Sequence, residues 1–179
     1  MFMHVNARKM SFLGLMMAFT VVLVILGSVI EMSTLFFLAF ASFCTGIVIV
    51  EYGVSIGAVF WVGSVLLSLI LSPHKLYAIT YGGMALYLLL TEFVWKYIFK
   101  QKVSKYNRVV LVVIKFLIFN AMYIPILVYA PSLIITKEIN SYLLIGFIVA
   151  GQVLLLIYDR AFHYFIGRYW VDMKRKLKI

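Results

Sequence analysis

The chain alternates long apolar stretches with short polar breaks, and this pattern predicts membrane-spanning helices. A helix needs about 20 mainly apolar residues to cross the hydrocarbon core of a bilayer. Because the polar breaks are short, consecutive helices must lie side by side and run antiparallel. The sequence therefore predicts an all-α integral membrane protein, a bundle of six transmembrane helices forming one domain over residues 1–179. The expected spans are approximately residues 10–30, 33–50, 54–71, 76–98, 109–129 and 141–158, followed by a basic cytoplasmic tail over residues 159–179.

The first apolar stretch follows Arg8 and Lys9 and at first sight resembles a secretory signal peptide. It is longer than the apolar core of a signal peptide and has no small-residue cleavage site. We therefore expect it to be a retained first span. Pro125 lies within the fifth apolar stretch and is expected to kink that helix near its outer end.

Composition supports lipid as the solvent, and the basic residues predict the orientation. The chain is 65% hydrophobic and 12% charged, whereas about a quarter of the residues of a soluble domain are charged. With the amino terminus inside, only Lys75 and Lys137 of the 16 Lys and Arg residues fall outside, and Lys115 lies within a span. The other 13 are then cytoplasmic, as the positive-inside rule requires. We expect both termini inside, in the cell (plasma) membrane, with anionic lipid rather than nucleic acid at the basic face.

The residues that could carry chemistry are dispersed along the chain. His4, His74 and His163 fall in different regions, and Cys44 is the only cysteine. No phosphate-binding loop or metal-ligand spacing is present. The acids also lie at different span ends rather than near the middle of the bilayer, where a proton relay would need them. We expect a protein that is not an enzyme, with no metal and no cofactor.

A few polar and aromatic residues lie at or just below the outer ends of different spans. Apolar walls with a few such groups are typical of small-molecule sites. The same residues have plainer roles: the tyrosines as interfacial belt residues, the lysine as a partner of lipid phosphate, and the asparagine as a hydrogen-bond partner of a neighbouring helix. The candidate substrate-binding residues are Glu31, His74, Lys75, Tyr81, Asn120 and Tyr123.

Lys115 lies about two turns inside the fifth span. An ionisable residue within a span is a functional candidate. Two turns rise only about 10 Å, however, and a lysine can extend its ammonium over that distance to the interface. Pairing with Glu51 or Glu92 would also neutralise its charge. We favour a structural role for Lys115.

Gly14 and Ala18 lie four residues apart in the first span and leave one helix face nearly bare of side chains. Such a face lets another helix approach closely. That helix could belong to the same bundle or to a partner subunit. Small residues also occur in the other spans, which favours close packing throughout the chain.

This layout resembles the substrate-binding subunits (S components) of energy-coupling factor (ECF) transporters. Those proteins have six helices, both termini inside, and an Ala-xxx-Ala type motif in the first helix that packs on a transmembrane coupling subunit. Here Gly14-Leu-Met-Met-Ala18 follows Arg8-Lys9, and Glu51-Tyr52-Gly53 occupies the place of a glycine-containing turn between the second and third helices. The segments 71–76 and 115–120 also resemble small bacterial six-helix membrane proteins with no assigned role.

The resemblance implies a subunit that binds a small, vitamin-like molecule for uptake energised by a separate ATPase module, with Gly14 and Ala18 at the docking face. No segment matches a vitamin-specific motif, so the ligand stays open. The alternative is a membrane scaffold or accessory protein of envelope assembly that uses the basic inner face and the tail.

Overall fold

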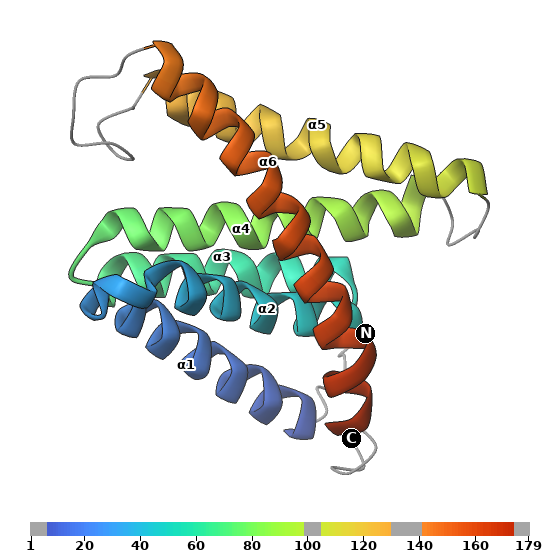
Figure 1. Cartoon of the computed structure of the whole chain (residues 1–179). Helices are drawn as coiled ribbons and strands as arrows, with labels where there is room; N and C mark the ends of the chain where they lie inside the picture. The colour runs from blue at the N-terminus through green and yellow to red at the C-terminus, as the bar shows by residue number, and fades with distance from the viewer. Residues whose placement is uncertain (1–6, 99–104, 130–140, 174–179) are drawn as a thin grey trace. The chain divides into compact units, whose positions relative to one another are not determined.

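The protein is helical throughout the part that the structure describes. The computed structural model describes residues 7–98, 105–129 and 141–173, and all its regular elements are helices. The chain divides into two compact units, Met1–Ile98 and Phe99–Ile179, whose helices are labelled in Figure 1. The expected all-α fold is therefore confirmed.

The first unit is an up-and-down arrangement of four helices, with consecutive helices packed against each other. Its turns are very short, so neighbouring helices run antiparallel (Figure 1). A 3₁₀ turn joins the first two helices, and a π-helical turn extends the last. The elements are α1 (Ala7–Val29), η1 (Glu31–Ser33), α2 (Thr34–Tyr52), α3 (Val54–Leu71), α4 (Lys75–Phe93) and η2 (Val94–Ile98).

The turn between α2 and α3 depends on one glycine. Gly53 has a φ of 88°, in the left-handed region that residues with a Cβ rarely adopt. Its N–H donates to Ile49 O (2.9 Å) at the end of α2, and its carbonyl accepts from the N–H of Gly57 (3.0 Å) in α3. This residue therefore ends one helix and begins the next within a single position.

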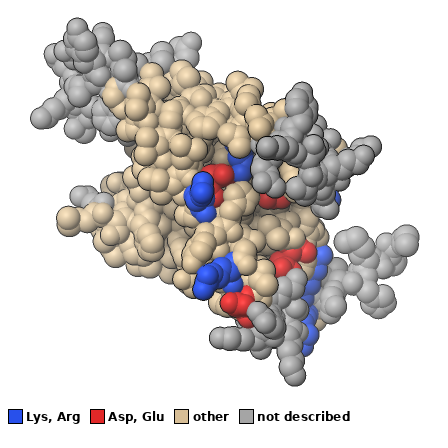
Figure 2. All heavy atoms as spheres, turned by 45° about the vertical axis from the view of Figure 1, so that its right-hand side comes forward, with Lys and Arg blue, Asp and Glu red and all other residues tan. Residues whose placement is uncertain are grey.

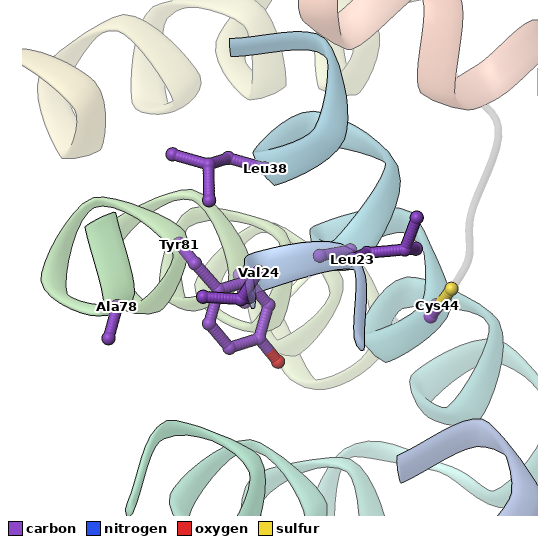
Figure 3. Packing of buried hydrophobic residues seen from close by; sticks show 8 residues of the cluster. Leu23, Val24, Leu38, Cys44, Ala78 and Tyr81 are labelled. Carbon is purple, nitrogen blue, oxygen red and sulfur yellow. The ribbon is translucent and has the colours of Figure 1, made fainter. Parts of the chain in front are cut away.

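The core of the first unit lies between α1, α2 and α4. Figure 3 shows part of this apolar cluster, in which Val24, Leu38 and Tyr81 are fully buried. Helix α3 buries both small residues and Phe60, and its Ser64 is fully buried as well. The Tyr81 hydroxyl lies 2.7 Å from the hydroxyls of both Thr45 and Ser64. This network joins α2, α3 and α4 at the centre of the unit.

Glycines mark the places where helices of the first unit approach most closely. A Cβ at each of these positions would lie within about 3.2 Å of a residue on a neighbouring helix. Close approach at small residues is the main packing device of membrane helices, because lipid removes the hydrophobic drive for helix association. The contacts are Gly27 with Phe37, Gly57 with Ile49, Gly63 with Met17, and Gly82 with Val65.

The second unit is a pair of antiparallel helices, α5 (Lys105–Tyr129) and α6 (Ser141–Tyr164), and α6 continues into the π-helical η4 (Phe165–Trp170). Pro125 lies inside α5. The pair also meets at a glycine, since a Cβ at Gly151 would lie 2.6 Å from the Tyr123 ring.

Four of these helices are long and apolar enough to cross a membrane, which indicates a membrane protein. They are Ala7–Val29, Thr34–Tyr52, Val54–Leu71 and Lys75–Tyr97, and Val109–Pro125 is a shorter apolar stretch among the described residues. They correspond to the first four predicted spans within a few residues.

We predict that Gly57→Ala destabilises the first unit, whereas Gly14→Ala is tolerated. An added methyl group at Gly57 would lie 3.1 Å from the Ile49 Cα and force α2 and α3 apart, but none of the described residues lies within 4 Å of a Cβ at Gly14. Overpacking of this kind costs about 1–3 kcal/mol. Thermal unfolding of the two variants in detergent measures the difference, and equal midpoints would contradict the packing described here.

Candidate functional site

Three of the predicted substrate-binding residues lie at one end of the first unit. Glu31 begins the turn between α1 and α2, while His74 and Lys75 belong to the turn between α3 and α4, so both turns are at the same end of the four helices. The Glu31 side chain is outside the described part of the structure. His74 is exposed, and its ring lies edge-on to that of Tyr77 at 5.8 Å.

Lys75 makes contacts that explain it without a ligand. Its ammonium donates to the carbonyls of Leu69, Ile70 (3.5 Å) and Ser72 (3.3 Å) at the carboxyl end of α3. A cation at this position satisfies carbonyls that have no partner within the helix and complements the helix dipole. The lysine therefore links the beginning of α4 to the end of α3 by hydrogen bonds.

Tyr81 lies inside the first unit rather than on an open surface. Its side chain is fully buried, and its hydroxyl is engaged with both Thr45 and Ser64. A ligand could reach this hydroxyl only by displacing one of them. The described contacts give Tyr81 a packing role, and its place in a ligand site stays a prediction.

Asn120 and Tyr123 belong to the second unit, where Asn120 joins the two helices. The Gln152 amide on α6 donates to Asn120 Oδ1 at 2.6 Å, and Asn120 Nδ2 donates to Phe116 O at 2.9 Å. Gln152 Oε1 is buried and has no hydrogen-bond partner in the described part of the chain. Asn120 thus has the neighbouring-helix partner that is the plainer of its two expected roles. The place of Asn120 and Tyr123 in a ligand site stays a prediction.

A charged cluster lies about one and a half turns along α5 from this amide pair. The Lys115 ammonium donates to Asp159 Oδ1 (2.7 Å) and Oδ2 (2.9 Å) on α6. It also lies 2.9 Å from His163 Nε2, one turn further along α6. The Lys115 side chain is only 8% exposed and that of Asp159 is 24% exposed. The buried ammonium thus has an acceptor for each of its three N–H groups.

The carboxylate that the structure places on this ammonium is that of Asp159, which was not one of the two partners considered, Glu51 and Glu92. The sequence holds a signal that could have found it. In an antiparallel pair, Lys115 near the start of one helix falls at the same depth as Asp159 near the end of the next. Gln152 lies seven residues, two helical turns, before Asp159 and so shares its face. Sequence reasoning missed Gln152 altogether.

Gly14 and Ala18, the predicted docking residues, are exposed on α1. The apolar side chains beside them, Leu15 (69% exposed) and Phe19 (46%), are exposed as well. Gly14 therefore differs from Gly27 on the same helix, which contacts α2. Packing of the Gly14 face within the first unit, one of the two alternatives, is not seen among the described residues.

The opposite end of the first unit from His74 carries basic residues. Lys9 lies 4.9 Å from the centre of the Tyr52 ring, and Lys96 lies 5.7 Å from that of Tyr97. Most of the face shown in Figure 2 is uncharged, and its coloured charged atoms are confined to a few places. Among the described residues, no group of three or more His, Cys, Asp or Glu side chains could hold a metal ion.

Comparison with known proteins gives no relative. No family model matches the chain, and neither a curated protein nor a solved structure matches it.

We predict that Lys115→Met and Asp159→Asn each destabilise the second unit by about 2 kcal/mol, because each leaves a poorly solvated group without its partner. The double variant should lose much less than the sum of the two losses, since the partners are removed together. Unfolding of the three variants in detergent measures this coupling. Additive losses would show that the two residues act independently.

Proposed function

We propose that the protein is a six-span protein of the plasma membrane that acts as the substrate-binding subunit of an uptake transporter. Its ligand would be a small, vitamin-like molecule captured from outside. A transmembrane coupling subunit with ATPases would supply the energy, as in the ECF transporters that the layout resembles.

The observation that carries this proposal is the exposed small-residue face of α1. Gly14 and Ala18 are both exposed, beside the exposed side chains of Leu15 and Phe19. Lipid could cover an apolar helix face, but a glycine in that face allows a partner helix to approach at backbone distance. The other described glycines of α1 and α3 already serve contacts inside the unit. Gly14 is thus available to a second protein.

Helix lengths support the six-span count. Helices α5 and α6 have 25 and 24 residues, about 36 Å at the α-helical rise, and the hydrocarbon core is about 30 Å thick. With both ends of the chain inside, Lys9 and Lys96 face the cytoplasmic lipid headgroups, where anionic lipid attracts them. The turns that hold Glu31 and His74 then face outward, where a ligand would enter.

We predict that Gly14→Leu abolishes association with the ATPase-bearing complex, because a leucine side chain keeps a partner helix from approaching at backbone distance. The matched control is Gly146→Leu on α6, since Gly146 also has nothing within 4 Å of an added Cβ. Affinity purification from membranes, with ATPase activity and small-molecule mass spectrometry of the same samples, provides the measurement. The wild type and Gly146→Leu should both retain ATPase activity and a defined bound metabolite.

The same experiment separates the alternative function. A scaffold of envelope assembly would purify with partner proteins but without a bound metabolite. Unchanged ATPase association in Gly14→Leu would contradict the docking role of α1.

A further inference from the structure

The cluster of Lys115, Asp159 and His163 fixes the protonation state of its histidine by geometry. A lysine ammonium donates hydrogen bonds and cannot accept one. His163 Nε2, which lies 2.9 Å from the ammonium, must therefore be the acceptor. The ring is then neutral and carries its proton on Nδ1. The remaining N–H groups of the ammonium are engaged by the two oxygens of Asp159.

We propose that His163 Nε2 is a binding site for a single proton, and that protonation of this nitrogen weakens the contact between α5 and α6 that Lys115 makes with Asp159 and His163. The inference is independent of the transport function proposed above. It needs only the two helices of the second unit.

Protonation changes the roles of the three groups. A charged imidazole donates from both nitrogens, so Nε2 can no longer accept from Lys115. Two positive charges then stand at hydrogen-bonding distance. Asp159 Oδ1 lies 3.7 Å from Nε2, so the charged ring competes with Lys115 for that carboxylate. One of the two cations must withdraw, and the bonds that Lys115 makes across the helix pair are weakened.

The surroundings of the ring favour the neutral form. His163 follows Tyr158, where the sixth predicted span ends, and its side chain is 55% exposed, so water can deliver a proton. In the described part of the second unit, the charged groups that face the ring are Lys115 from α5 and Asp159 from α6, with the Phe162 ring beside it. Partial burial and then the Lys115 ammonium lower the pKa of His163, and Asp159 opposes them.

The contact between α5 and α6 should weaken at low pH. The pKa of His163 in the folded protein lies below its ordinary value of 6.5. The folded helix pair thus binds a proton less readily than the unfolded chain. The contact of Lys115 with Asp159 and His163 is therefore fully formed above about pH 6.5, the ordinary histidine pKa. It weakens as the pH falls below that value.

The first test is nuclear magnetic resonance of the full chain with ¹⁵N-labelled histidine, in lipid nanodiscs. The chain has three histidines, and His163→Gln identifies the signals of His163 by their loss. At neutral pH, His163 should carry its proton on Nδ1, and it should titrate below the ordinary histidine pKa of 6.5. In Lys115→Met, the titration should move to higher pH and the preference for Nδ1 should disappear. A proton on Nε2 in the wild type, or a titration unaffected by Lys115→Met, would overturn the proposal.

The second test measures the helix pair directly. Spin labels at Val112 and Val153, which are both exposed, report the distance between α5 and α6 by pulsed electron resonance. The wild type should show one population at pH 7.5 and a second, longer distance at pH 5.5. His163→Gln keeps an acceptor but cannot be charged, so it should show the single population at both values. Distances that do not change with pH in the wild type, or that change equally in His163→Gln, would contradict the proton site.

Discussion

The structure depends on the absence of water from the hydrocarbon core, which obliges every polar group there to find a partner within the protein. Helices satisfy the backbone, and most buried hydroxyls also find partners, although Ser68 Oγ has none among the described residues. Thr20 and Thr91 donate to carbonyls of their own helices, while the Tyr81 hydroxyl is hydrogen-bonded to hydroxyls on two other helices. In the second unit, the Lys115 ammonium is held by acceptors on α6. Polar side chains thus fix which helices are neighbours and at what register.

Glycines complete this arrangement by setting how closely the helices approach. Gly57 and Gly82 bring α3 against both of its sequence neighbours, and Gly151 does the same for α5 and α6. Gly14 differs from the other described glycines of α1 and α3, because no described residue lies within 4 Å of a Cβ added there; Gly146 and Gly167 of the second unit are open in the same way. The proposed docking role rests on this contrast within one chain. A small residue that contacts nothing inside the unit can serve contact with another protein, whereas one that lies between two packed helices serves their close approach.

The hydrophobic pattern was sufficient to predict the helices of the first unit, because short polar breaks such as Glu51-Tyr52-Gly53 mark the turns directly. It could not predict tertiary contacts. Tyr81 was placed near a rim by its distance from Lys75 along the chain, but its burial depends on which face of α4 meets α2 and α3. The partner of Lys115 was missed for a related reason, since charge alone does not distinguish Asp159 from Glu51 or Glu92. Register between antiparallel helices makes that distinction.

The proposed function requires six helices that cross the membrane and leave both ends of the chain inside. It can be tested by introducing single cysteines at His4, Lys75, Lys102, Lys137 and Lys178 and labelling intact cells with a maleimide that cannot cross the membrane. Native Cys44 is buried at 3% exposure, and the parent protein provides its background. The account predicts labelling at positions 75 and 137 from outside, and at the other three only after the membrane is permeabilised. Labelling of position 137 only from inside would contradict it, because α5 and α6 would then not cross the bilayer.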